Sequence, residues 1–203
     1  MRSITEIDSI KNEKGKIMSV NIFWDNSNIR LVGRNFSEDQ EPGHKKDFRI
    51  YFRNLLQFAA NNRDVSYAFV AGSIPPQNDN LWQYFKKLGV IVEIQERGIL
   101  KNKEIAVDEA IHTKMLERIL DVKTPETIVL LTGDGNGYTQ GKGFIRQLER
   151  AVEYRWKIEV ISWSIGCNKR LKEFASYYGT YRELDPVYDS VTFTKDRIVR
   201  PLP

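Results

Sequence analysis

The sequence has few of the residues that build disulfide or soft-metal sites. Its 203 residues include one cysteine, Cys167, and two histidines, His44 and His112. A single cysteine excludes an internal disulfide, a structural zinc cluster and a Cys-X-X-Cys redox pair, and Cys167 is expected to be inert. Two histidines exclude a multi-histidine metal site. Carboxylates must therefore do most of the binding of any metal, which favours Mg²⁺ or Mn²⁺.

Long apolar runs are also missing. No stretch approaches the ~20 residues that a membrane-spanning helix needs, so no membrane partner is expected. Residues 1–18 lack the continuous apolar segment of a secretory signal, and we expect a cytoplasmic protein. Hydrophobic residues make up 41% and charged residues 29% of the chain, which excludes disordered, collagen-like and coiled-coil proteins. The net charge of +4 is compatible with a polyanionic partner but does not identify one.

Short β-branched runs alternate with amphipathic stretches along the chain. The runs predict strands over residues 20–24, 65–70, 90–94, 127–131 and 158–163. The amphipathic stretches predict helices over residues 45–61, 78–88, 105–120, 142–155 and 169–178. This alternation predicts an α/β fold, a three-layer sandwich with a mainly parallel central sheet.

The chain reads as one domain with an extension at each end. We expect an N-terminal extension over residues 1–18, a domain over 19–185 and a C-terminal extension over 186–203 that contains an edge strand at 190–194. The polar segment 33–44, with two glycines and one proline, is predicted to be a loop.

Three aspartates are predicted to meet at one edge of the sheet. Asp25 ends the first strand, and Asp134 follows the fourth after Thr132-Gly133. Asp108 lies on the apolar stripe of the helix that follows the third strand, in its first turn by this reading. Parallel strands end at the same edge, where ligands bind in α/β proteins. The alternative is that these acids only cap helices and begin turns.

Crowded carboxylates repel one another and raise one another's pKa unless a cation neutralises them. A divalent metal held by Asp25, Asp108 and Asp134 resolves that conflict. Such a metal activates water and stabilises charge on a phosphoryl group, so phosphodiester hydrolysis is the favoured reaction class.

The motifs resemble the NYN domains of the PIN-like nuclease superfamily. The matching segments are Asp25-Asn26-Ser27-Asn28-Ile29, Val107-Asp108 and Thr132-Gly133-Asp134-Gly135-Asn136, within roughly residues 19–165. The resemblance implies a PIN-like fold and metal-dependent ribonuclease activity, with the three aspartates as ligands. It also implies that Asn28 hydrogen-bonds a ligand water or the substrate phosphate.

One position departs from the family pattern. Many members carry an acid two residues after the third aspartate, where this chain has Asn136. An amide oxygen can bind a metal but brings no charge, which favours one-metal or weak catalysis. Glu109, whose helical angle also falls within the apolar arc, is a candidate to compensate.

Basic and aromatic residues supply candidates for RNA binding. Lys103 precedes the helix near the site, and Tyr138 is placed to stack on a base. The other basic candidates are Lys142, Arg146 and Arg150 at four-residue spacing, with Lys45, Lys46, Arg49 and Arg53. The alternative for each charged residue is a solvated surface position.

Several further patterns have simpler explanations. The glycines from Gly133 to Gly143 lack the Gly-Lys-Ser/Thr ending and the following helix of a P-loop. His112 is either a core histidine or a partner of Asp108, one turn away, and Phe144 is expected in the core.

Three functions remain open, in this order. The first is a metal-dependent ribonuclease acting on single-stranded or structured RNA. The second is an RNA-binding NYN domain with weak or no turnover, motivated by Asn136. The third is a receiver-type domain with Asp25 or Asp134 as phosphoacceptor.

Overall fold

The computed structural model describes residues 18–73, 79–95, 103–138 and 141–203. The predicted N-terminal extension therefore lies outside the described residues, apart from Met18. Within the described ranges, none of the helices is long and apolar enough to cross a membrane.

The centre of the protein is a parallel sheet of six strands in the order β4-β3-β1-β5-β6-β7. The strands are β1 (Val20–Asp25), β3 (Val65–Ser73), β4 (Ile91–Gln95), β5 (Thr127–Leu131), β6 (Lys157–Ser162) and β7 (Thr180–Glu183). The first five correspond to the predicted strands within about three residues, and β7 was not predicted. All six residues of β1 are buried, as expected for a central strand covered on both faces.

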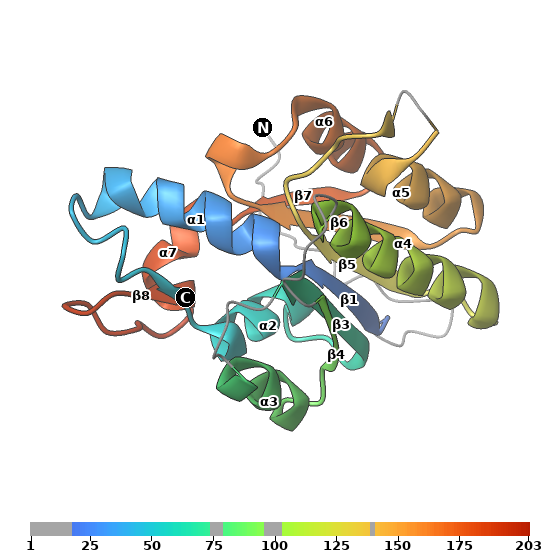
Figure 1. Cartoon of the computed structure of the whole chain (residues 1–203). Coiled ribbons are helices and arrows are strands. Elements are labelled where there is room, and N and C mark those ends of the chain that lie inside the picture. Colours follow the sequence, from blue (N-terminus) through green and yellow to red (C-terminus); the bar gives the residue numbers. More distant parts are fainter. Residues whose placement is uncertain (1–17, 74–78, 96–102, 139–140) are drawn as a thin grey trace, which may run out of the picture.

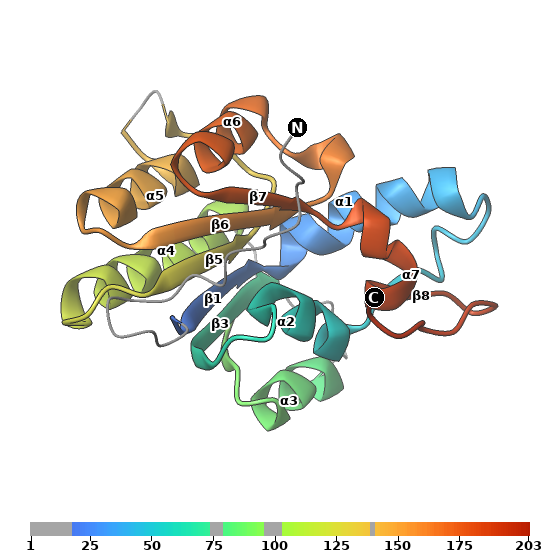
Figure 2. The ribbon, with the colours of Figure 1, turned by 180° about the vertical axis from the view of Figure 1, so that it is seen from behind.

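Six helices cover the two faces of this sheet (Figures 1 and 2). They are α1 (Asn26–Gln40), α2 (Phe52–Ala60), α3 (Asp79–Lys87), α4 (Lys103–Asp121), α5 (Gly143–Glu153) and α6 (Lys169–Tyr178). Neighbouring strand residues point to opposite faces, so Trp24 packs with α1, α2 and α3, while Phe23 packs with α4, α5 and α6. The predicted three-layer α/β class is confirmed.

The direction of winding reverses between β1 and β5. From β1 the chain moves outward to β3 and β4, then returns through α4 to β5 on the other side of β1, and continues to β6 and β7. Doubly wound sheets bind ligands beyond the carboxyl ends of the strands at such a reversal. The ends of β1 and β5 are therefore where a site is expected.

The prediction of a loop over residues 33–44 is wrong, because α1 continues to Gln40. Gly33 is part of the pattern that predicts the loop, but it lies inside helix α1, where another element packs closely against it. A Cβ built on Gly33 would lie 2.7 Å from Nε1 of Trp163 and 2.8 Å from Cζ of Phe48. The glycine therefore allows α1 to approach the aromatic core, and the true turn begins after the helix, at residues 41–43.

The helix predicted over 45–61 is also shorter than expected. The short strand β2 (Arg49–Ile50) precedes it and pairs antiparallel with β8 (Thr192–Phe193) in a second, two-stranded sheet. The strand predicted over 190–194 is thus reduced to β8, after the one-turn helix α7 (Tyr188–Val191), and it does not extend the main sheet.

Candidate active site

A cavity of about 280 Å³ lies beyond the ends of β1 and β5, and we call it the acidic cavity. Its apolar wall is formed by Leu31 and Val32 of α1 and Val107 of α4. Its polar lining is Asp25, Ser27, Asn28, Asp108, Asp134 and Asn136. Three carboxylates from three separate elements therefore line one cavity at the point where the sheet reverses direction.

Asp25 is both the last residue of β1 and the N-cap of α1. Its Oδ1 accepts a hydrogen bond from the backbone N–H of Asn28 at 2.9 Å, and its Oδ2 accepts one from Oγ1 of Thr132 at 3.1 Å. The side chain is buried, and burial raises its pKa to about 6, with a further increase from the charge of Asp134 and an opposing decrease from the two hydrogen bonds. Asp25 therefore caps α1, but its hydrogen bonds stabilise the charged carboxylate by less than burial destabilises it.

Asp108 has no such local role as a helix cap. The helix begins at Lys103, two residues earlier than predicted, so Asp108 is its sixth residue and lies beyond the first turn. The stabilising effect of a helix N-terminus falls off within that turn. Helix capping therefore does not explain the position of Asp108. This half-buried residue follows the buried Val107 and lines the acidic cavity.

Asp134 lies in the loop that follows β5. Its Oδ1 accepts a hydrogen bond from the backbone N–H of Asn136 at 2.9 Å, and its own N–H donates to Oγ1 of Thr132 at 3.2 Å. Asn136 is exposed and lines the cavity beside it. The loop thus presents one carboxylate and one amide.

Asn28 connects the two strand ends rather than only facing a ligand. Its Oδ1 accepts a hydrogen bond from the backbone N–H of Gly133 at 2.8 Å, joining the first turn of α1 to the loop after β5. Asn28 also lines the acidic cavity, and its side-chain N–H groups can donate hydrogen bonds to an anion.

Several of the predicted site residues do not reach this cavity. Glu109 is exposed and is not part of the lining, so the prediction that it compensates for Asn136 is not supported by its position. Lys45 and Lys46 follow the other end of α1, whose 15 residues span about 22 Å. Lys103 is the first residue of α4, and its side chain lies outside the description.

The basic residues predicted on α5 are largely paired within the protein. Arg146 lies 2.7 Å from Glu149 and 3.8 Å from Glu153, and Arg150 donates to Gln147 at 3.0 Å. The Tyr138 hydroxyl donates to the same Glu149 at 2.7 Å.

Lys142 is the exposed N-cap residue of α5. Phe144 is buried, as predicted, and the ring of His112 packs against it at 4.5 Å. Burial lowers the pKa of His112.

Arg170 near this loop was missed in the sequence. Its guanidinium lies over the Tyr138 ring, 5.1 Å from the centroid. The only available signal was its place two residues after Asn168, a strong N-cap type before an apolar-periodic stretch.

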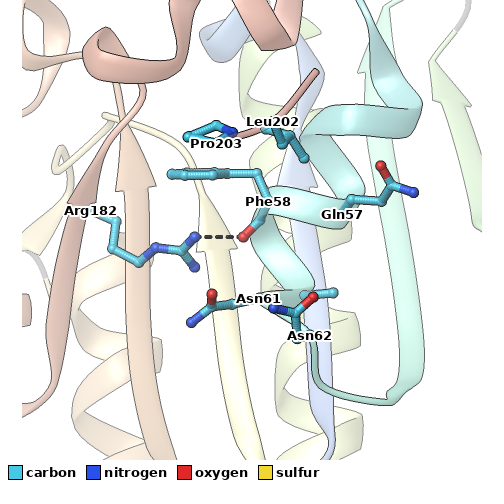
Figure 3. Close-up of a pocket in the computed structure, with 8 residues that line it drawn as sticks. Gln57, Phe58, Asn61, Asn62, Arg182, Leu202 and Pro203 are labelled. Atoms are coloured by element: carbon cyan, nitrogen blue, oxygen red, sulfur yellow. Dashed lines mark hydrogen bonds between the residues drawn. The ribbon is translucent and has the colours of Figure 1, made fainter. Parts of the chain in front are cut away.

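A second and larger cavity, of about 530 Å³, lies where α2 ends and has a different character (Figure 3). Nη2 of Arg182 donates to the backbone oxygen of Phe58 at 2.5 Å. The guanidinium carbon of Arg182 also lies 4.1 Å from the centroid of the Phe58 ring. Arg182 also pairs with the buried Glu159 at 3.5 Å. Its charge therefore serves the packing of α2, and no carboxylate side chain is among the eight residues that line the cavity.

The donor set of the acidic cavity fits a hard divalent cation. Its polar side chains are carboxylates, amides and a hydroxyl, which Mg²⁺ and Mn²⁺ prefer. The carboxylates stand apart, however. Within the described part of the chain, no three acidic, histidine or cysteine side chains are close enough together to hold a metal ion. Each Asp25 oxygen that accepts a hydrogen bond still has a second lone pair, so these bonds do not use up the donor set.

The chain is similar to known proteins in its family and in its fold. The NYN domain model matches residues 19–181. No curated protein matches. A crystal structure of a protein of unknown function from Vibrio parahaemolyticus RIMD 2210633 is similar, with a TM-score of 0.56 and 15% sequence identity over 83% of this chain and 93% of that one. That likeness concerns the fold alone, a three-layer α/β arrangement. The match to the family model covers most of the chain, which therefore belongs to the NYN domain family.

Proposed function

We propose that this protein is a metal-dependent ribonuclease whose active site is the acidic cavity. One observation carries the proposal: three carboxylates from β1, α4 and the loop after β5 line one cavity at the sheet reversal. NYN domains are nuclease-like and generally act on RNA with divalent metals, and this cavity provides the oxygen donors that such a reaction needs.

The residues of the cavity have distinct roles in this proposal. Asp25, Asp108 and Asp134 hold Mg²⁺ or Mn²⁺, and Asn136 offers a further oxygen without charge. A divalent metal held in this way supplies an activated water and stabilises negative charge on the phosphoryl group. Asn28 donates its side-chain amide to a phosphate oxygen, while its carbonyl oxygen fixes Gly133 and thereby the position of Asp134.

The protein contributes no covalent nucleophile in this proposal. Among the described residues that line the cavity, Ser27 is the one with a hydroxyl group, and none is a histidine or a cysteine. The attacking group is therefore water, and the products are expected to be those of hydrolysis. The third possibility, a receiver-type phosphoacceptor, gains no support from the family match.

The direct test is cleavage of end-labelled single-stranded RNA by the purified protein with Mg²⁺, Mn²⁺ or EDTA. Asp134→Asn keeps the acceptor for the Asn136 N–H but removes the charge, and we expect it to lower cleavage by about 100-fold or more. Asp121→Asn, an exposed position at the end of α4, is the matched control and is expected to cleave as the wild type does. Cleavage that persists in EDTA or in Asp134→Asn would contradict the proposal.

A second candidate is an RNA-binding domain with weak or no turnover. Two observations favour it. Asn136 supplies no charge, and the three described carboxylates that line the cavity are not close enough together to hold a metal ion jointly. It predicts salt-dependent RNA affinity without products in any metal. A measurable metal-dependent rate that is lost in Asp134→Asn would exclude it.

A further inference from the structure

The loop that carries Asp134 is attached to helix α6 as well as to α1. The backbone N–H of Asn168 donates to the backbone oxygen of Gly133 at 2.8 Å, and Oδ1 of Asn168 caps α6 by accepting from Arg170 and Leu171. A Cβ on Gly135 would lie 2.5 Å from Cγ of Asn168. The first turn of α6 therefore lies directly beside the loop of the acidic cavity.

Arg170 is the cation that this arrangement leaves available. Tyr138 is anchored through its hydroxyl to Glu149, and the guanidinium of Arg170 lies over its ring. Among the described residues, no carboxylate lies within ion-pair distance of Arg170, whereas Arg146 is paired with Glu149 and Glu153. An exposed guanidinium held over an aromatic ring has its planar donors free for a phosphate.

The same side of α6 continues as an exposed aromatic surface. Phe174, Tyr177 and Tyr178 follow Arg170 at spacings of four, seven and eight residues, which places them on one face of the helix. Tyr177 is 81% and Tyr178 53% exposed, and their ring centroids lie 4.6 Å apart. From Arg170 to Tyr178 the helix rises about 12 Å, which is enough for a few nucleotides.

We propose that this face of α6, from Arg170 to Tyr178, binds a single RNA strand where it leaves the acidic cavity. Arg170 holds a backbone phosphate beside Tyr138, and Tyr177 and Tyr178 stack on the following bases. A cation followed by exposed rings is the combination that binds single strands without reading their sequence. The proposal rests on the proposed function for its substrate class, and it assigns residues outside the acidic cavity.

The composition of this α6 face and its continuity with the acidic cavity favour RNA rather than a protein as its partner. The exposed rings follow the guanidinium of Arg170 along one face of α6. Lys169 beside it is 90% exposed, and its ammonium lies 3.8 Å from Glu173. A strand bound here has its scissile phosphate over the three carboxylates and its flanking nucleotides along α6.

The test measures binding of fluorescent oligouridylates of three and ten nucleotides by anisotropy, in EDTA, so that no cleavage occurs. Arg170→Gln is expected to weaken binding of both lengths about tenfold and to reduce the salt dependence of log Kd by about 0.7 to 1 per log unit of salt. The double variant Tyr177→Ala/Tyr178→Ala is expected to weaken binding of the ten-nucleotide strand about tenfold, with the short strand and the salt dependence unchanged.

Lys87→Gln is the control, because it removes the same charge from an exposed residue in the last turn of α3, on the face of the sheet opposite to α6. It is expected to leave affinity unchanged. Wild-type affinity in both the Arg170 and the tyrosine variants would overturn the inference and indicate that this face serves another partner, such as a protein.

A cleavage assay with Mn²⁺ on the same variants separates this inference from the proposed function. If wild type cleaves RNA and the α6 variants bind and cleave normally, the inference is wrong and the function stands. If RNA binds through Arg170 but wild type does not cleave, the inference stands and the function is wrong. If RNA neither binds nor is cleaved, both are wrong.

Discussion

Replacing Asp25 with asparagine is expected to stabilise the metal-free protein at neutral pH. Burial and the charge of Asp134 raise the pKa of Asp25 from 3.8 to about 6. A difference of about 2 pKa units corresponds to about 3 kcal/mol, which the folded protein loses when Asp25 ionises. Asparagine is a good N-cap and keeps an acceptor for the Asn28 N–H, so the variant removes the charge and retains the cap.

The stability difference between Asp25→Asn and the wild type is expected to grow as the pH rises. Between pH 4 and pH 6 the folded state holds a proton on Asp25 that the unfolded state has released, so the contribution of this group to stability falls as the pH rises. Asp25→Asn should therefore unfold at about the same urea concentration as wild type near pH 4. At pH 7 in EDTA it should be more stable by up to about 3 kcal/mol, or roughly 6–12 °C in Tm for a chain of this size.

Bound metal is expected to stabilise the wild type but not Asp25→Asn, and so to offset most of the stability advantage of the variant. A ligand present at 100 times its Kd stabilises a protein by about 2.7 kcal/mol, so saturating Mn²⁺ should raise the Tm of wild type and leave Asp25→Asn unchanged. Asp121→Asn is the matched control and should follow the wild type at every pH and metal concentration. An Asp25→Asn variant that is equally or less stable at pH 7 in EDTA would refute the argument that burial of this charge is costly.

Three further substitutions test the packing, two at the acidic cavity and one in the buried ion-pair network of β6. Asn28→Ala leaves the buried N–H of Gly133 without its acceptor and should lower the free energy of unfolding by about 1–3 kcal/mol in urea titration; an unchanged midpoint would contradict this. Gly135→Ala places a methyl group 2.5 Å from the Asn168 side chain, so a loss of about 1–3 kcal/mol and weaker RNA cleavage are expected, and wild-type thermal stability would count against it. Glu159→Gln leaves its two half-buried arginine partners, Arg63 and Arg182, without a counter-charge and should cost about 3 kcal/mol by chemical denaturation. A loss below about 1 kcal/mol would contradict the importance of that network.

The sheet could be predicted because its strands are continuously apolar, while segments without that signal could not. The strand β5 was located to the residue, since a buried β-branched run is bounded by polar residues on both sides. The strand β7 is half-exposed and four residues long, so its sequence has no comparable pattern. Gly33 suggested a loop because a single sequence does not show that Trp163, 130 positions away, packs against that glycine.

The candidate site divides in the same way. Asp25 could be predicted because it directly follows a predicted strand, and Asp134 because only Thr132 and Gly133 separate it from another. Asp108 could be predicted because an acid on an apolar helix stripe is costly. The RNA-binding basic residues are harder to predict from the sequence, because the spacing of charges on a helix does not reveal which cations form ion pairs. Glu149 takes the charge of Arg146, and Arg170 becomes prominent only when Tyr138 is placed beneath it.

One residue, Gly133, joins the two halves of the proposed RNA site through the hydrogen bonds of its N–H and its carbonyl oxygen. The N–H of Gly133 is held by Asn28 of α1, on one face of the sheet, and its carbonyl oxygen is held by Asn168 at the start of α6, on the other. Asp134 follows directly, so its position depends on both helices. A Cβ on Gly133 would lie 2.4 Å from the backbone oxygen of Gly166, which leaves no space for a larger residue at this junction. Because the same residue fixes the carboxylate and the start of α6, a change that shifts the α6 cap should alter cleavage as well as strand binding, whereas a change at Tyr177, two turns further along, should alter binding alone.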